Sequence, residues 1–184
     1  MVMLPDARAP QGLRIYAIGD VHGCTNSLGT MHRLIRDHLA HAPVPDWRIV
    51  HVGDYIDRGP DSRGAVAMLA ALGADPRVVC LRGNHDQYLI EFLADPDADT
   101  FDNWLFNGGT TTLAEYGADP GEPVLVGRTR RRELHAILTA ALPAPHRAFL
   151  DGLGLSLRLG DYLFVHAGLR PGVPLAAQTL KDLL

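Results

Sequence analysis

The sequence predicts an α/β domain built around a parallel β-sheet, and three observations support this prediction. Apolar segments of strand length alternate with segments whose apolar residues recur at helical spacing. A polar cluster directly follows each apolar strand. The clusters that contain Asp20, Asp54 and Asn84 are separated by 34 and 30 residues, each the length of one strand-helix-strand unit. Because the carboxyl ends of parallel strands share one edge, the clusters are predicted to lie side by side.

The first half of the chain reads as three strands alternating with three helices. Each predicted strand is apolar and runs into glycine or aspartate, whereas each predicted helix repeats its apolar residues every three or four positions. Asp61 or Ser62 can cap the second helix, and Gly73 can end it. The predicted strands are 13–20, 47–54 and 77–83, and the predicted helices are 26–41, 61–73 and a segment carrying Leu89, Phe92 and Leu93.

The second half of the chain is less regular. Residues 95–130 are rich in Asp, Gly, Thr and Pro, which predicts an irregular region. Helical spacing returns in residues 134–138, and residues 155–169 read as two strands about a Gly-Asp turn. That hairpin indicates a second, partly antiparallel sheet. We expect residues 1–12 to form a lead-in and residues 13–184 to form one domain.

Composition and charge argue against several classes of protein. The 184 residues carry a formal charge of −4, which gives no sign of the basic face that nucleic-acid binding needs. No apolar run approaches the roughly 18 residues of a membrane helix, and the N-terminus lacks the pattern of a secretory signal. The two cysteines, Cys24 and Cys80, form no disulfide framework. A reduced, cytoplasmic setting is therefore expected.

Several histidines and tryptophans are assigned by their position in the predicted elements. His51 lies within a strand and is expected to be a buried histidine with its hydrogen bonds satisfied. His32 and His146 lie on helices or at their edges and are expected at the surface or as caps. Trp47 and Trp104 are expected to pack rather than to bind a ligand.

The residue types in the polar clusters point to metal chemistry. Asp20 and His22 lie two positions apart just past a strand, and a carboxylate with an imidazole suits a divalent transition metal. Asp54 can reach the same ion, Asn84 can supply an amide oxygen, and His166 can supply another imidazole. Five such ligands exceed what one catalytic ion usually takes from protein. They suit two ions that share one carboxylate and clamp a phosphoryl group.

The remaining residues of the clusters would complete a phosphoryl-transfer site. Arg58 offers a planar guanidinium for phosphate oxygens. His85 is left free to protonate a leaving oxygen, and Asp57 can orient it. Taken singly, a Gly-Asp after a strand is usually a turn, and an Asp-Arg pair is usually a surface ion pair worth under about 1 kcal/mol. The coincidence of three clusters after three consecutive strands favours a functional site.

Four segments together resemble the motif series of a known family. They are GDVHG (19–23), GDYIDRG (53–59), GNHD (83–86) and FVHAG (164–168). This series is similar to that of the calcineurin-like metallophosphoesterases. The -DRG ending resembles the phosphoprotein phosphatase branch, which includes bacterial serine/threonine protein phosphatases and symmetrical diadenosine tetraphosphatases. The resemblance covers nearly the whole chain and is strongest to bacterial members.

The resemblance implies a fold and a pair of metal ions. The fold would be a four-layer αββα sandwich of two mixed β-sheets flanked by helices. Two divalent ions are implied, most commonly manganese, with iron or zinc as alternatives. Asp20, His22 and Asp54 would hold the first ion, and Asp54, Asn84 and His166 the second. A hydroxide bridging the two ions would attack a phosphomonoester directly, without a phosphoenzyme.

The resemblance also implies roles for the other residues of the site. His85 would be the general acid with Asp57 as its partner. The Asn-Gly-Gly segment at 107–109 would line the substrate groove. The implied phosphate-binding or substrate-binding residues are Arg58, Asn84 and Arg170.

One feature of the family pattern is missing from this sequence. Relatives complete the second metal site with a histidine in a later Gly-His element, whereas no histidine follows His166 here. We therefore expect the domain to be incomplete at its C-terminus, with strands missing. We also expect the second site to lack one ligand and so to bind its metal more weakly.

Three functions are consistent with the sequence. The leading hypothesis is a serine/threonine protein phosphatase acting on phosphorylated proteins or small phosphoesters. The second is a symmetrical diadenosine tetraphosphate hydrolase of the same fold, for which adenine-stacking aromatics would be expected. The third is a catalytically impaired domain that binds phosphorylated partners or metal without hydrolysis. The sequence leaves the oligomeric state open.

Overall fold

The larger sheet of the computed structural model, which describes residues 6–121 and 126–184, consists of three parallel strands in sequence order. They are β1 (Leu13–Ile18), β2 (Asp46–His51) and β3 (Val78–Cys80). The register pairs Ile18 with His51 and His51 with Cys80. The strands therefore end level with one another, directly before the polar clusters. The predicted α/β arrangement with a parallel sheet is confirmed.

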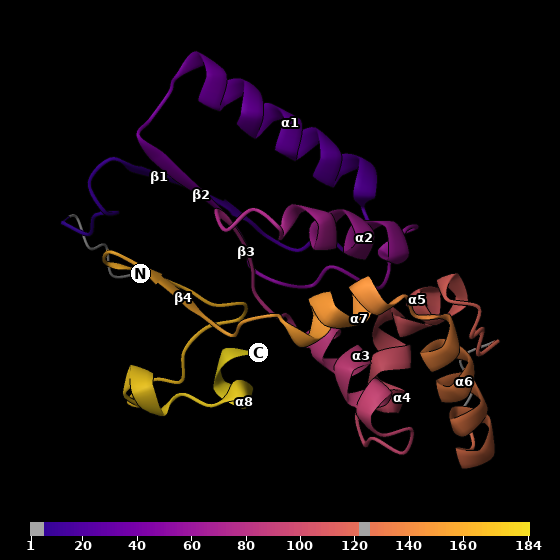
Figure 1. The fold of residues 1–184 in the computed structure, drawn as a ribbon. Helices are drawn as coiled ribbons and strands as arrows, with labels where there is room; N and C mark the ends of the chain where they lie inside the picture. Colours follow the sequence, from indigo (N-terminus) through magenta and orange to yellow (C-terminus); the bar gives the residue numbers. More distant parts are fainter. Residues whose placement is uncertain (1–5, 122–125) are drawn as a thin grey trace.

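Helices follow each parallel strand, as the apolar spacing predicts. They are α1 (Thr25–His41), α2 (Ser62–Leu72) and α3 (Asn84–Ala94). Helix α1 lies across one face of the sheet (Figure 1), where Ile35 packs against Ile49 and Val78. The Asp61 side chain caps α2 by accepting a hydrogen bond from the backbone N–H of Gly64 at 2.8 Å.

The prediction that residues 95–130 are irregular is wrong for much of this region. The structure forms α4 (Phe101–Trp104), a π-helical segment η1 (Leu105–Gly109), α5 (Thr110–Glu115) and the start of α6 (Arg128–Ala141), which is followed by α7 (Ala144–Asp151). Burial explains the helices, because Trp104, Leu113 and Tyr116 are almost fully buried. Tertiary packing thus outweighs the low helical propensity of the Gly and Thr residues. Residues 122–125 lie outside the described residues.

The predicted hairpin is present as a small antiparallel sheet. It consists of β4 (Leu157–Leu159) and β5 (Tyr162–Phe164), and it is followed by the 3₁₀ turn η2 (Leu175–Ala177) and α8 (Leu180–Leu183). Within the described ranges each sheet is of one kind, parallel or antiparallel, rather than mixed. A parallel bridge between Leu81 and Gly154 joins the segment before β4 to the larger sheet. The four-layer arrangement is therefore seen only in part.

The main hydrophobic core lies among α2, α3 and the helices of the second half, which cluster below the parallel sheet (Figure 1). Trp104, Tyr55 and Tyr116 are its largest fully buried side chains. Two of these, Tyr55 and Trp104, sit next to the polar clusters, so the core also supports that edge. Among the described helices, none is both long enough and apolar enough to span a bilayer.

Two histidines that were expected at the surface are buried instead. His32 on α1 points into the sheet, where its Nε2 lies 3.1 Å from Nε2 of His51. His146 on α7 is held by the Tyr116 hydroxyl, 2.8 Å from its Nδ1. His51 is buried as expected, but its Nδ1 has no hydrogen-bond partner among the described residues. Burial, with His32 as a second cause, lowers the pKa of His51 to about 3.

The buried state of His51 predicts acid destabilisation. A histidine with a lowered folded pKa stabilises the protein fully above its unfolded pKa of about 6.5, and this stability is lost as pH falls toward the folded value. At about pH 5 the loss for His51 should be about 2 kcal/mol. Urea unfolding at several pH values should therefore show a flatter pH dependence for His51→Leu than for the wild type.

The matched control for this experiment is His38→Gln, which changes an exposed imidazole on α1 that is hydrogen-bonded to the Tyr16 hydroxyl. It should keep the wild-type slope of stability against pH. Equal slopes for the wild type and His51→Leu would contradict the prediction.

Candidate active site

The loops that follow the three parallel strands are tied together by backbone hydrogen bonds. The N–H groups of Val21 and His22 both donate to the carbonyl of Asp54 at 2.9 Å. The buried Asp86 carboxylate accepts hydrogen bonds from the N–H groups of Gly83, Asp54 and Tyr55, at 2.8, 2.9 and 3.1 Å. Asp86 thus links the loops after β2 and β3. Burial raises the pKa of Asp86 to about 7, against the lowering effect of these hydrogen bonds.

The backbone at this edge adopts conformations that are rare for residues with side chains. Positive φ occurs at four non-glycine residues of the described chain: His22 (42°), Asp54 (55°), Asp57 (73°) and Arg58 (66°). All four are site residues predicted from the sequence. Such strain persists where the surrounding structure holds it, and it clusters at functional sites.

Glycine is required beside these residues for a different reason. Gly53 has φ of 111°, and a Cβ there would lie 2.4 Å from the backbone nitrogen of Gly83. The loops after β2 and β3 can therefore approach each other only because position 53 lacks a side chain.

Two histidines direct a nitrogen that carries a lone pair toward the carboxylates of the site. The Nδ1 of His22 is 2.7 Å from the carbonyl of Ile56, and the Nδ1 of His166 is 2.9 Å from the carbonyl of Val52. Each Nδ1 must carry the proton in order to donate to a carbonyl, so each Nε2 keeps its lone pair. This is the arrangement that orients metal-binding histidines.

The carboxylate of Asp54 lies at the centre of the predicted metal ligands. Its Oδ2 is 3.7 Å from Nε2 of His22, and its Oδ1 is 3.5 Å from Nε2 of His166. Asp20 lies 3.9 Å from His22. Asp54 belongs to two groups whose ligand atoms all lie within 4.8 Å of one another, one with Asp20 and His166 and the other with His22 and His85. Asp20 and Asp54 therefore each lie within 3.9 Å of His22, and Asp54 lies between two potential sites, but neither of these groups contains both Asp20 and His22.

The chemistry of the donors fits divalent metal ions. The Nε2 of His166 lies 2.9 Å from Oδ1 of Asn84, and both atoms are acceptors once Nδ1 of His166 carries the proton. Two lone pairs at this distance repel each other, and a cation bound to both would remove the repulsion. Imidazole, carboxylate and amide oxygen together form a ligand set typical of Mn, Fe or Zn. The predicted ligands of the second ion, Asp54, Asn84 and His166, are thus also adjacent.

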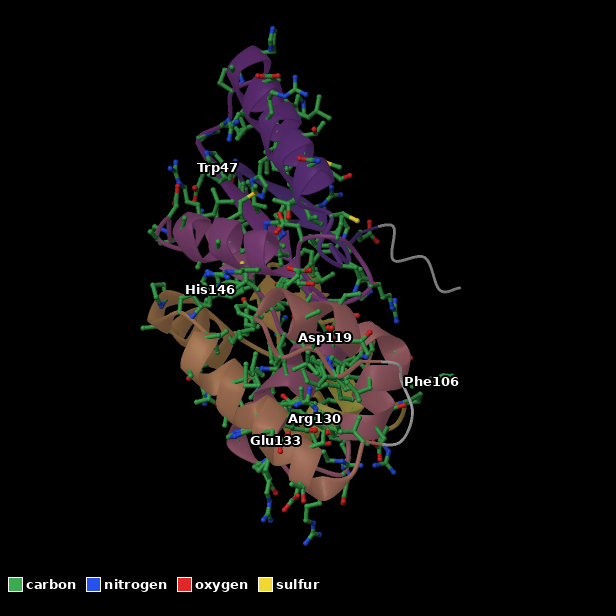
Figure 2. The ribbon with its side chains drawn as sticks, turned by 90° about the vertical axis from the view of Figure 1, so that its right-hand side faces the viewer. Trp47, Phe106, Asp119, Arg130, Glu133 and His146 are labelled. Atoms are coloured by element: carbon green, nitrogen blue, oxygen red, sulfur yellow. The ribbon has the colours of Figure 1, made fainter. Side chains whose placement is uncertain are left out.

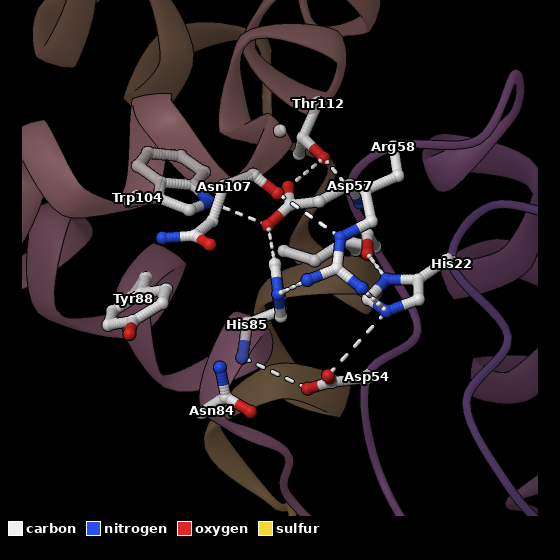
Figure 3. Close-up of polar contacts among 12 residues, drawn as sticks. His22, Asp54, Asp57, Arg58, Asn84, His85, Tyr88, Trp104, Asn107 and Thr112 are labelled. Atoms are coloured by element: carbon white, nitrogen blue, oxygen red, sulfur yellow. Dashed lines mark hydrogen bonds and ion pairs between the residues drawn. The ribbon is translucent and has the colours of Figure 1, made fainter.

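A buried carboxylate orients the imidazole of His85. The Nδ1–H of His85 donates to Oδ2 of Asp57 at 2.6 Å, and both side chains are almost fully buried. The indole N–H of Trp104 donates to the same oxygen at 2.8 Å, and the hydroxyl of Thr112 donates to Oδ1 at 2.6 Å. Asp57 is therefore held from three directions, as Figure 3 shows.

Trp104 and Thr112 are site residues that the sequence reading missed. Trp104 was assigned to packing, and Thr112 lay in a segment expected to be irregular. No local signal reveals their contact with Asp57, because the residues lie 47 and 55 positions away from it in the chain.

Arg58 lies between the two imidazoles of the site. Its Nη1 is 2.8 Å from Nε2 of His22, and its Nη2 is 2.8 Å from Nε2 of His85. The Nε–H of Arg58 donates to the carbonyl of Asn107 at 3.3 Å. The predicted Asn-Gly-Gly segment is thus adjacent to Arg58. A Cβ at Gly108 would lie 2.8 Å from Cγ of Arg58, so this approach needs glycine.

Arg170 lies apart from these contacts. Its side chain is 68% exposed and its Nη1 is 3.7 Å from Oδ1 of Asp182 on α8. Its backbone N–H donates to Gln178. The proposed role of Arg170 in substrate binding stays a prediction.

Comparison with known proteins identifies the family. Residues 13–182 match the family model described as calcineurin-like phosphoesterase. The chain is 37% identical to serine/threonine-protein phosphatase 1 of Salmonella typhimurium over 56% of its own length and 44% of the relative's. It is 33% identical to a symmetrical bis(5'-nucleosyl)-tetraphosphatase of Aromatoleum aromaticum over 87% of its length and 46% of the relative's. The chain belongs to the calcineurin-like phosphoesterase family, whose chemistry uses divalent metal ions.

A solved structure supports the fold. A putative diadenosine tetraphosphatase superposes with a TM-score of 0.60 at 22% identity, covering 96% of this chain and 60% of the other. The alignments with the Salmonella and Aromatoleum relatives cover 44% and 46% of those proteins, so the chain spans less than half of the length of these curated relatives.

The three hydrogen bonds of Asp86 predict a large loss of stability when its carboxylate is removed. Asp86→Ala leaves three N–H groups without their acceptor, two of which belong to Asp54 and Tyr55. We expect a loss of about 3 kcal/mol or more in the free energy of unfolding, measured in urea. Asp37→Ala removes an exposed carboxylate on α1 and should change stability by under about 0.5 kcal/mol. Equal stabilities for the two variants would contradict the structural role of Asp86.

The central place of Asp54 predicts its effect on metal binding. Asp54→Asn keeps the shape of the side chain but removes the charge that faces His22 and His166. Calorimetric titration with Mn²⁺ should show an affinity weakened by roughly tenfold or more. Asp161→Asn, in the β4–β5 turn, is the matched control and should bind Mn²⁺ like the wild type. Unchanged binding by Asp54→Asn would exclude this residue as a ligand.

Proposed function

We propose that this chain carries the phosphoester-hydrolysing site of a serine/threonine protein phosphatase. The observation that supports the proposal most directly is the contact of Arg58 with His85, which is itself oriented by Asp57, beside a group of carboxylates and imidazoles. Hydrolysis of a phosphomonoester needs a cation that binds phosphate, an oriented proton donor and a set of metal ligands, and these residues can supply all three.

The side chains divide the work of the reaction. Two bound divalent ions, which we propose to be manganese, would be held by Asp20, His22, Asp54, Asn84 and His166 and would supply charge neutralisation and an activated water. Arg58 holds the phosphate oxygens with its planar fork. His85 delivers a proton from Nε2 to the leaving oxygen, and Asp57 stabilises the imidazolium that donates it.

One step in this scheme requires Arg58 to change partners. Its Nη1 now donates to Nε2 of His22, and its Nη2 donates to Nε2 of His85. The same lone pair of His22 is the one that a metal ion would use, so metal binding and the hydrogen bond exclude each other. The hydrogen bond from Nη2 must also break before Nε2 of His85 can carry the proton that it delivers. Once both bonds are broken, Nη1 and Nη2 can each donate to a phosphate oxygen.

Hydrolysis of a dinucleoside tetraphosphate is the second candidate function. It is supported by the Aromatoleum relative, which aligns with 87% of this chain, compared with 56% for the protein phosphatase of Salmonella. The site residues are equally suited to the phosphomonoester of a phosphopeptide and to the phosphoanhydride of a dinucleoside tetraphosphate. The choice between the two therefore depends on groups beyond the phosphate.

Both functions are tested by one experiment. The chain, loaded with Mn²⁺, should release phosphate from an aryl phosphate and a phosphoserine peptide faster than it cleaves diadenosine tetraphosphate. His85→Asn removes the proton donor at Nε2 and should lower kcat by roughly 10²-fold or more with phosphopeptide. Binding of the peptide without turnover of any substrate would instead support a catalytically impaired domain. Preference for the dinucleotide would favour the second candidate.

A further inference from the structure

Three side chains form a neutral patch beside His85, here called the Asn107 patch: Tyr88 of α3, Asn103 of α4 and Asn107 of η1. The ring of Tyr88 meets that of His85 edge to face, with centroids 5.9 Å apart. Figure 3 shows Tyr88 and Asn107 on one side of His85, while His22 and Asp54 lie on the other. The patch thus lies on the side of His85 away from the metal-type ligands.

Hydrogen bonds inside the patch fix the direction of the Asn107 amide. Its Nδ2 donates to the backbone carbonyl of Asn103 at 2.7 Å and to the side-chain oxygen of Asn103 at 3.1 Å. Asn103 is fixed in turn, because its Nδ2 donates to the Tyr88 hydroxyl at 2.7 Å. Both amide hydrogens of Asn107 are therefore used. Its Oδ1 accepts no hydrogen bond from any described residue, and it is an acceptor without a donor.

The π-helical segment holds this acceptor next to the phosphate-binding arginine. The backbone carbonyls of Asn107 and Gly108 accept hydrogen bonds from Nε and from the backbone N–H of Arg58, both at 3.3 Å. Trp104, one turn earlier, is bound to Asp57. The segment is therefore anchored to the catalytic residues at both ends, and the position of Asn107 relative to His85 is fixed. Rigid positioning of this kind is expected where a site selects its substrate.

The hydrogen-bonding groups of the Asn107 patch favour a leaving group with N–H donors over one with anionic oxygens. His85 would give its proton to the leaving oxygen, and the Tyr88 ring lies edge to face against the His85 imidazole, so a leaving group that extends past the imidazole toward Tyr88 meets the patch. A phosphorylated peptide brings backbone N–H donors there, whereas a nucleoside polyphosphate brings anionic oxygens. Within the described part of the chain, no cationic side chain is hydrogen-bonded to the three side chains of the patch, and Arg58 reaches only the backbone carbonyl of Asn107. The acceptor oxygen suits the N–H donor and not the anion, whereas the aromatic ring, which can also stack on a nucleobase, does not discriminate by itself.

We propose that Asn107 and Tyr88 determine specificity for peptide substrates. Oδ1 of Asn107 accepts a hydrogen bond from a backbone N–H next to the phosphorylated residue, and the Tyr88 ring packs against the peptide. Asn103 is a positioning residue that holds the amide in this orientation. This inference rests on the proposed function and identifies its substrate class as phosphopeptides.

The test is a double-mutant cycle between the protein and the peptide. Asn107→Ala should raise KM for a short phosphoserine peptide about fivefold, the effect of one lost hydrogen bond, and should leave kcat/KM for an aryl phosphate within about twofold. The backbone amides beside phosphoserine are N-methylated one at a time. With the wild-type protein, methylation of one of these amides should raise KM about as much as Asn107→Ala does. At that position the variant should show no further loss.

Two further variants separate positioning from contact. Asn103→Ala should raise the KM for the peptide, and Tyr88→Phe, which keeps the ring but removes the acceptor for Asn103, should do so to a smaller extent. Tyr162→Phe on the distant β5 removes a hydroxyl that is bonded to Ala7 and is the matched control, with unchanged KM.

Three results would overturn the proposal. They are equal effects of Asn107→Ala on both substrates, additive losses in the cycle, and a larger effect of the variant on diadenosine tetraphosphate than on the peptide. Peptide affinity measured by fluorescence anisotropy supplies the same cycle without turnover. A chain that binds the peptide but hydrolyses nothing would therefore contradict the proposed function, while the binding cycle would still decide the role of Asn107.

Discussion

The site depends on one buried carboxylate that holds two strand ends together. Asp86 accepts hydrogen bonds from backbone N–H groups on both sides of the gap between the loops after β2 and β3. These bonds place Asp54 beside the first turn of α3, where the backbone N–H of His85 donates to Oδ1 of Asp54 at 3.0 Å. A buried acceptor with several N–H donors fixes backbone position more firmly than a side-chain ion pair could. The convergence of the functional side chains follows from this link.

The two aspartates of the GDYIDRG segment have similar burial but opposite surroundings. Asp57 is surrounded by hydrogen-bond donors from His85, Trp104 and Thr112, so its charge is compensated inside the protein. Asp54 accepts one hydrogen bond, from the backbone N–H of His85, and otherwise faces imidazole nitrogens that carry lone pairs, so much of its charge is left for an external cation. This contrast explains how one short loop can supply both an orienting group and a metal ligand.

Local pattern was sufficient for the parts of the structure that local forces determine. The parallel strands, their helices, the Asp61 cap and the hairpin were predictable, because periodicity and capping are visible within a few residues. The convergence of Asp20, Asp54 and Asn84 was predictable from strand spacing. The helices after residue 100, the burial of His32 and the support of Asp57 by Trp104 were not. Each depends on a partner distant in sequence, and the local periodicity of apolar residues does not indicate such contacts.

The left-handed backbone at His22, Asp54, Asp57 and Arg58 creates a conflict between stability of the fold and function of the site. Glycine adopts such angles without a steric cost and would relieve strain at any of these positions. It would also delete an imidazole, a carboxylate or a guanidinium that the site uses. Substitutions to glycine that would stabilise these two loops therefore cannot be made without loss of the site. The backbone strain is offset by burial of the hydrophobic core that surrounds Tyr55 and Trp104.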